Sequence, residues 1–256
     1  MRIPAEPAPP LADADDAIRL LHSKYGNIRF LKAGGTIEAR FPAERRRKRV
    51  SFVMMLERPD KLRIRAYRTL VPLLFELVYN GKRCWLYIPN KRTAYLSEDC
   101  DVFYFDNGDI ALSANMLIAA VVVVSDFDAL LSTASELHQE GEFAVLTFMA
   151  PPGMRRELWI DRVTGLINRQ IIFNRNGEKE VIVEYREQDA TGNAVVPRHL
   201  ELILPQADTS ISLNIDEIKI DAQIPPGAFE FSPPLGTSIL QAEKDVGVFS
   251  QLVDEE

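Results

Sequence analysis

The feature that most constrains the fold is a two-residue alternation of apolar and polar side chains that recurs along most of the chain. It is clearest in residues 50–56 and 62–66, which flank the turn Arg58-Pro-Asp-Lys61. A period of two places successive side chains on opposite faces of a β-strand, so each such strand has one apolar face. Asn-Gly pairs at 80–81 and 176–177 indicate tight hairpins. The pattern predicts a mainly β chain of about eleven strands.

Helices are expected beside these strands. Acidic residues at 13, 15 and 16 favour the amino terminus of a helix over residues 14–24, and Tyr25-Gly-Asn27 ends it. Residues 109–132 also have approximate helical spacing, although the four valines at 121–124 favour a strand. Gly34-Gly35 predicts a bend or bulge before a strand at 36–41. No linker or repeat separates the strands, so we expect one continuous antiparallel sheet.

The composition narrows the classes of function. Hydrophobic residues make up 46% of the 256 residues and charged residues 26%, which is ordinary for a globular protein with a core. The net charge of -7 disfavours the attraction to phosphate on which nucleic-acid binding depends. The longest apolar stretch, 110–124, is shorter than the ~20 residues that a membrane helix needs. We therefore expect no nucleic-acid partner and no membrane-spanning helix.

Three regions are predicted along the chain. Residues 1–12 are rich in Pro and Ala and are typical of an extended tether. Residues 13–241 are expected to form a single domain, and residues 242–256 form a short acidic tail. In exported proteins such a tether often follows a removed signal or a lipidated cysteine, so we expect export although neither feature is in this sequence.

The apolar faces of the predicted strands form the principal candidate site. Burial of each such side chain contributes ~1.5 to ~3 kcal/mol, so one interpretation is a plain core. The other is a cavity open to ligand, because larger barrels enclose cavities, and aliphatic and phenylalanine side chains suit acyl chains. The candidate lipid-binding wall consists of Val50, Phe52, Met54, Leu56, Leu62, Ile64, Phe75, Leu77, Leu86, Leu158, Ile171, Phe173 and Leu213.

No motif for catalysis or metal binding competes with this wall. The three histidines have no carboxylate or cysteine at the spacing of a zinc site, and the common nucleophile and phosphate-binding motifs are lacking. We expect no catalytic residue, no metal and no cofactor. Cys84 and Cys100 flank a predicted hairpin whose register places Cys84 nearer Ser97 or Glu98 than Cys100, so a disulfide and two free thiols both remain open.

Several segments, taken in order, resemble the LolA/LolB-like superfamily of bacterial lipoprotein carriers and receptors. They are the first helix, the strand pair 49–56 and 59–64, residues 80–87 and 93–96, the strand and Thr-Gly turn in 158–169, and the closing segment 224–236. The resemblance spans most of residues 14–236. It implies an α+β, mainly β fold: a single antiparallel half-open barrel whose concave face is closed by helices.

The resemblance also implies a function, namely the binding and transfer of acyl chains of a lipoprotein or lipid in a hydrophobic cavity, as in lipoprotein localisation to the outer membrane. It implies no enzymatic activity, and a periplasmic location with or without an outer-membrane lipid anchor. We expect a monomer, with the membrane surface and an envelope protein as candidate partners. The alternative is a protein-interaction or envelope-sensing module on the same fold, without lipid transport.

Two segments are candidate membrane contacts. Family members that receive lipoproteins have a hydrophobic loop between the third and fourth strands. Here that position holds Leu70, Val71, Leu73 and Leu74. These residues can instead begin the fourth strand and pack inside. A basic run, which can meet anionic head groups or form a solvated hairpin turn, consists of Arg45, Arg46, Arg47 and Lys48.

Overall fold

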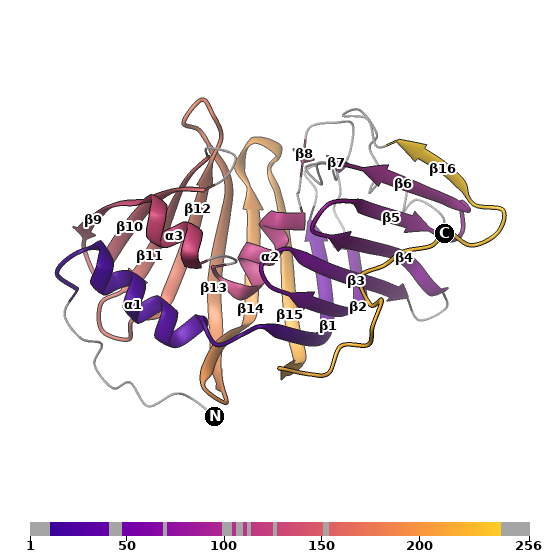
Figure 1. Cartoon of the computed structure of the whole chain (residues 1–256). Helices are drawn as coiled ribbons and strands as arrows, with labels where there is room; N and C mark the ends of the chain where they lie inside the picture. The colour runs from indigo at the N-terminus through magenta and orange to yellow at the C-terminus, as the bar shows by residue number, and fades with distance from the viewer. Residues whose placement is uncertain are drawn as a thin grey trace. The chain divides into compact units, whose positions relative to one another are not determined.

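The computed structural model describes residues 11–40, 48–68, 71–98, 104–105, 110–111, 114–124, 127–150 and 154–241 (Figure 1). These residues form a mainly β structure. Its elements are α1 (Ala14–Tyr25), β1 (Phe30–Arg40), β2 (Lys48–Glu57), β3 (Lys61–Arg68), β4 (Val71–Asn80), β5 (Cys84–Ile88), β6 (Thr93–Ser97), β7 (Tyr104–Phe105), β8 (Ile110–Ala111), α2 (Ala114–Val122), α3 (Phe127–Thr133), β9 (Ala134–Glu140), β10 (Phe143–Ala150), β11 (Met154–Asp161), β12 (Ile167–Phe173), β13 (Lys179–Thr191), β14 (Ala194–Leu204), a 3-10 turn (Pro205–Ala207), β15 (Thr209–Ile220) and β16 (Ser238–Gln241).

A large open sheet contains most of the strands. Within the described residues it has 14 strands in the order β16-β6-β5-β4-β3-β2-β1-β15-β14-β13-β12-β11-β10-β9, while β7 pairs with β8. Hairpin neighbours are antiparallel, and β16 is parallel to β6. The expected mainly β, antiparallel and unclosed architecture is confirmed, with 14 strands instead of about eleven. The additional strands include the polar β9 and the exposed edge strand β16, neither of which has an apolar alternation.

The chain divides into two compact units. The first unit comprises Met1–Ile28, Arg40–Glu44 and Ala120–Asn214, and the second comprises Arg29–Ala39, Arg45–Ala119 and Ile215–Glu256. Strand β15 contributes to both units, since residues 209–214 belong to the first and residues 215–220 to the second. The single domain over residues 13–241 stays a prediction.

Helix α1 forms where its sequence signals predicted it. The Asp13 side chain caps the helix by accepting a hydrogen bond from the backbone N–H of Asp16 at 2.9 Å. The buried side of the helix consists of Ala17, Ile18, Leu21 and Tyr25. In the first unit, α1 packs against β9, β14 and α3, and α3 packs against β10. These two helices therefore cover one face of strands β9–β14 (Figure 1).

Two local predictions differ from the structure. The helix expected over 109–132 is present as two helices, α2 and α3, because α2 ends at Val122 and Val123 has a φ of 67°. There the backbone N–H of Val124 donates to the Val122 carbonyl at 2.7 Å, which is a tight three-residue turn. No bulge forms at Gly34-Gly35: β1 and β2 pair without a register shift, and Gly35 lies opposite Phe52. Cross-strand pairing there includes both glycines in one continuous strand.

Candidate ligand-binding faces

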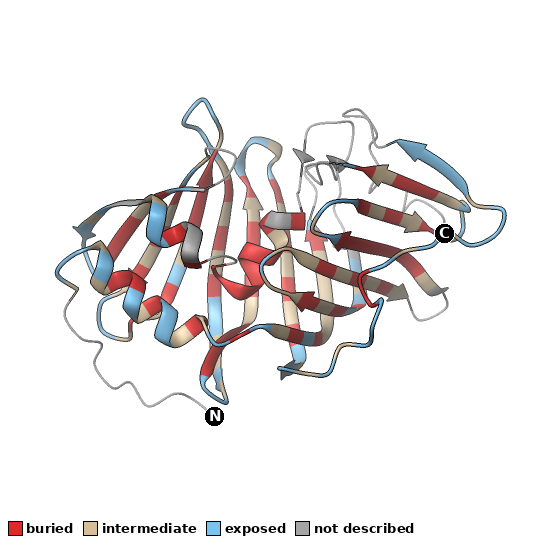
Figure 2. Ribbon diagram, in the orientation of Figure 1, coloured by how far each residue is buried: buried red, intermediate tan, exposed pale blue. Residues whose placement is uncertain are grey.

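In the second unit, strand register brings most of the predicted wall together on one face. A row across β1–β6 consists of Ala33, Met54, Ile64, Leu77, Leu86 and Tyr95. Phe52 and Phe75 flank Ala66 in the next row, and Leu56 lies opposite Leu62. Figure 2 shows the resulting alternation of buried and more exposed residues along these strands. Val50 shares the face but is only half-buried near the start of β2.

The wall of the second unit is covered by protein. The predicted wall residues on this face, other than Val50, are each at most 4% exposed, and Tyr95 is 8% exposed. Because this burial is produced by the protein's own residues, the face is part of the packed interior in this conformation. A ligand that binds there has to displace the side chains that cover it.

In the first unit, a row of side chains crosses seven strands from β9 to β15. It consists of Leu137, Leu146, Leu158, Gln170, Val183, Leu202 and Ile211. We call the face that carries this row the inner face of the first unit. Leu213, opposite Leu200, lies on the same face and is buried. The predictions for Leu158 and Leu213 as buried, inward residues therefore agree with their positions.

Ile171 and Phe173 lie on the opposite face, which corrects their assignment to the wall. Ile171 pairs with Glu157, and the guanidinium of Arg155 lies 3.8 Å from the ring centroid of Phe173. The error has a simple origin: residues 171–173 are Ile-Ile-Phe, so the apolar pattern does not alternate there. Register with β11 and β13 turns Gln170 inward instead.

Sequence reasoning missed a polar cluster on the inner face of the first unit. It contains Arg156, Gln170 and Tyr185, all less than 9% exposed. The Tyr185 hydroxyl donates to the side-chain oxygen of Gln170 at 3.3 Å. Burial raises the pKa of Tyr185, and it lowers the pKa of Arg156. Arg156 and Gln170 occupy inward positions of strands that are otherwise apolar, and this interruption of the alternation was the available sequence signal.

The first unit also contains a polar pocket. This pocket has a volume of about 480 Å³ and lies at the start of β12, beside β13. Its lining consists of Asp161, Thr164, Leu166, Ile167, Asn168, Tyr185, Arg186, Glu187, Gln188 and Asp189. Asp161 already accepts hydrogen bonds from the backbone N–H groups of Val163 and Thr164. Its polar lining makes this pocket a poor match for the body of an acyl chain.

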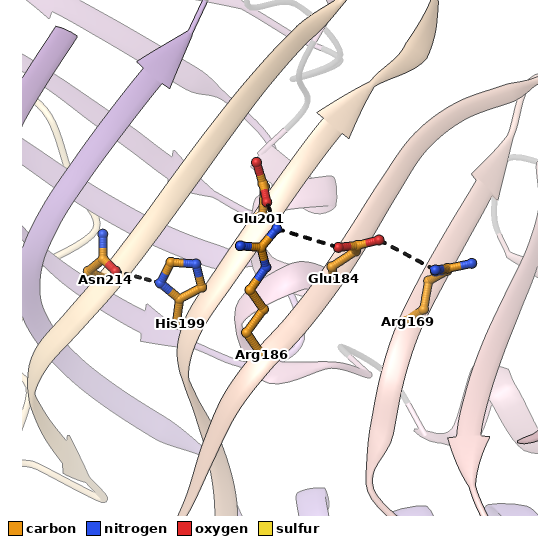
Figure 3. A network of polar contacts seen from close by, with 6 residues as sticks. All are labelled: Arg169, Glu184, Arg186, His199, Glu201 and Asn214. Atoms are coloured by element: carbon orange, nitrogen blue, oxygen red, sulfur yellow. Dashed lines mark hydrogen bonds and ion pairs between the residues drawn. The ribbon is translucent and has the colours of Figure 1, made fainter. Parts of the chain in front are cut away.

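The other face of β12–β15 carries a charged network (Figure 3). Glu184 and Glu201 lie directly opposite each other on β13 and β14. Their carboxylates repel each other unless a cation lies between them. Arg186 forms ion pairs with both carboxylates, and Arg169 lies 3.4 Å from Glu184. These residues are partly exposed, so the network marks a solvated surface.

In the second unit, the closing segment 222–237 packs on the face opposite the apolar rows. The Phe231 ring lies 5.6 Å from the rings of both Trp85 and Tyr87. Nη1 of Arg63 donates to the Ala228 carbonyl at 2.7 Å. This segment was predicted only as a motif, and in the structure it covers aromatic residues of β5.

The predicted membrane contacts are placed only in part. Leu70, Arg45, Arg46 and Arg47 lie outside the described residues, as do the side chains of Val71 and Lys48. Val71 begins β4, and Leu74 is 6% exposed, too buried for a membrane contact in this conformation. Leu73 is half-buried. Leu74 therefore fits the alternative interpretation, in which these residues begin the fourth strand and pack inside.

Other expected features are as follows. Cys84 pairs with Ser97 in the β5–β6 register and is disulfide-bonded, while Cys100 lies outside the described residues. Over the part of the chain that the structure describes, no helix is long and apolar enough to cross a membrane. The same part contains no group of three or more His, Cys, Asp or Glu side chains that could hold a metal ion.

Comparison with known proteins identifies the fold. No protein-family model and no curated protein matches the sequence. A DUF1329 family protein from Desulfovibrio piger superposes with a TM-score of 0.66 at 14% identity, over 85% of this chain and 95% of that chain. A LolA superfamily protein, NE2245 from Nitrosomonas europaea, gives 0.61 at 8% identity, over 86% and 98%. An outer membrane lipoprotein-sorting protein domain from Vibrio parahaemolyticus gives 0.62 at 11% identity, over 85% and 97%. The LolA-like resemblance is thus confirmed at the level of fold.

Proposed function

We propose that this chain binds acyl chains of a lipid or lipoprotein against an apolar face of its open sheet and transfers them without chemical change. The row from Ala33 to Tyr95 carries the proposal, because six adjacent strands present apolar side chains to one face. A wall of this kind holds a chain by non-directional contacts, which permits both binding and release. The fold shared with a lipoprotein-sorting domain supports the same ligand class.

We also propose a location in the bacterial envelope, in the periplasm or anchored at the outer membrane. The disulfide at Cys84 supports an oxidising compartment, since disulfides are rare in reducing cytosol. The shared fold with LolA-like proteins points the same way. In this proposal the basic run from Arg45 to Lys48 contacts anionic head groups.

The direct test is lipid extraction and native mass spectrometry of the purified protein, together with uptake of a fluorescent fatty acid. Ile64→Glu places a carboxylate in the central row and should reduce uptake about tenfold or more. Val53→Glu is the matched control, because Val53 is 39% exposed on the other face of the neighbouring strand β2. Absence of lipid and of probe uptake in the native protein would contradict the proposal. Unfolding of Ile64→Glu alone would identify the face as a filled core.

The near-complete burial of the wall favours a second candidate, a protein-interaction or envelope-sensing module with a filled interior. The two functions differ in their response to ligand. A fatty acid present at 100 times its Kd stabilises a protein that binds it by about 2.7 kcal/mol. The interaction module should show no change in melting temperature when oleate is added.

A further inference from the structure

Arg156 is a buried cation to which the described residues offer no counter-charge. It is 8% exposed, and its Nε has no hydrogen-bond partner among them. Among the described residues the titratable group that interacts with it is Tyr185, whose phenol is neutral at pH 7, and no ion pair with a carboxylate forms. An unpaired charge removed from water is unfavourable, so buried guanidinium groups are normally paired. Within the described part of the chain, Arg156 therefore lacks the anion that its position calls for.

Gln170 presents a second unused donor on the same face. It is 1% exposed, and its Nε2 likewise has no hydrogen-bond partner in the described structure. Its Oε1 is occupied by the Tyr185 hydroxyl at 3.3 Å. Arg156 lies opposite Ile172, which is two positions from Gln170 on β12. Arg156 and Gln170 are therefore diagonal neighbours on the sheet, with Cα atoms about 7–8 Å apart. The unused groups of both residues are donors.

The surroundings of these donors are apolar. Phe148 lies opposite Arg156, and Leu158 and Val183 lie opposite Gln170. Tyr185, which hydrogen-bonds Gln170, also contributes to the lining of the polar pocket of about 480 Å³. Donors set in an apolar face match a ligand that has an acidic head and a hydrocarbon tail.

We propose that Arg156 and Gln170 bind the oxyanion head group of an acyl-chain ligand on the inner face of the first unit. This inference rests on the acyl-chain binding proposed above and adds a polar anchor to it. A guanidinium donates two parallel hydrogen bonds to a carboxylate or a phosphate, and the Gln170 amide adds a third donor. A free fatty acid and a lysophospholipid both carry such an oxyanion.

The test compares ligands with the same chain and different heads. The folded protein is loaded with the neutral probe N-phenyl-1-naphthylamine. The measurement is the concentration of oleate, oleyl alcohol or oleoyl lysophosphatidic acid that displaces this probe. We expect oleate to displace the probe at a concentration about tenfold or more lower than oleyl alcohol does. In Arg156→Met the two concentrations should become equal, because the charge that distinguishes the heads is gone.

Arg155→Met is the matched control. Arg155 precedes Arg156 on β11, faces the other side and is paired with Glu157 at 3.3 Å. This variant should keep the wild-type preference for oleate. Lysophosphatidic acid distinguishes a phosphate head group from a carboxylate head group. If displacement of the probe by lysophosphatidic acid also depends on Arg156, the site accepts phosphate as well as carboxylate. If only oleate depends on Arg156, the site is a carboxylate site.

Two results would overturn the inference: equal displacement by oleate and oleyl alcohol in the wild-type protein, or an unchanged preference in Arg156→Met. If Arg156→Met does not fold, Gln170→Leu decides, and a preference that falls less than about threefold counts against the site. Displacement by neither ligand would instead show that acyl-chain binding itself fails. The head-group site and the proposed function are thus distinguished by whether oleyl alcohol binds.

Discussion

The hydroxyl of Tyr25 donates a hydrogen bond of 2.7 Å to the side-chain oxygen of Gln188. The same hydroxyl accepts one of 3.1 Å from the backbone N–H of Ile167, 142 residues away in the sequence. Gln188 Nε2 then donates to the Ile167 carbonyl at 2.7 Å. These three bonds connect the last turn of α1 to β12 and β13 and hold the helix on the sheet of the first unit.

Tyr25→Phe should destabilise the protein by about 1–3 kcal/mol, because the buried N–H of Ile167 loses its acceptor and Gln188 loses its donor. Urea unfolding followed by circular dichroism measures the change. Tyr87→Phe is the control, since the Tyr87 ring packs on Phe231 and is half-buried. We expect this control to change stability by less than about 0.5 kcal/mol. Equal effects of the two changes would show that the Tyr25 bonds contribute nothing.

Stability should fall above pH 10. Burial raises the pKa of Tyr25 and of Tyr185 above the ordinary value of 10.0. For a group whose pKa is raised on folding, the stabilisation is present below the unfolded pKa and is lost as the pH rises above it. Each tyrosine should therefore lower the free energy of unfolding by about 1.4 kcal/mol per pH unit above 10. Urea unfolding at pH 9 to 11 measures the free energy of unfolding as a function of pH, and Tyr185→Phe should make its decrease with pH less steep. An unchanged decrease would show that Tyr185 does not cause the loss of stability.

Glu76→Gln should cost about 3–5 kcal/mol, because it leaves two guanidinium groups without their buried carboxylate. Oε1 of Glu76 lies 2.6 Å from Nε of Arg63 and from Nε of Arg65, and the Glu76 side chain is only 6% exposed. Hydrogen bonding to Glu76 also raises the pKa of Arg65. Glu57→Gln is the control, since its pair with Lys61 is more exposed and should contribute less than about 1 kcal/mol. Similar denaturation midpoints for both variants would contradict the expectation.

Phe231→Ala should loosen the closing segment from β5. The change removes aromatic packing against Trp85 and Tyr87, so we expect a loss of about 1–3 kcal/mol and an altered fluorescence of Trp85. Leu235→Ala provides the comparison, because Leu235 is in the same segment and is fully exposed. A Phe231→Ala protein with the stability and emission spectrum of Leu235→Ala would argue against this packing.

Much of the fold follows from local signals in the sequence. The apolar alternation of residues 50–56 and 62–66 predicts β2 and β3, and Asn-Gly pairs predict the hairpins at 80–81 and 176–177. The acidic cap and apolar spacing predict α1. These signals act within a few residues, where backbone geometry and side-chain direction are set by neighbours along the chain. All of these segments except the hairpin at 176–177 also carry the LolA-like resemblance.

Tertiary structure decided what the local pattern leaves ambiguous. In the run Ile171-Ile172-Phe173 every residue is apolar, so only pairing with β11 and β13 determines which side chain faces inward. The same pairing brings Gln170 beside Arg156. The sequence by itself therefore determined the strands with an apolar alternation, the Asn-Gly turns and the first helix, because these depend on short-range periodicity. The face of each ambiguous residue, and the donors gathered on the inner face, depend on contacts between residues far apart in the chain, which only the assembled sheet supplies.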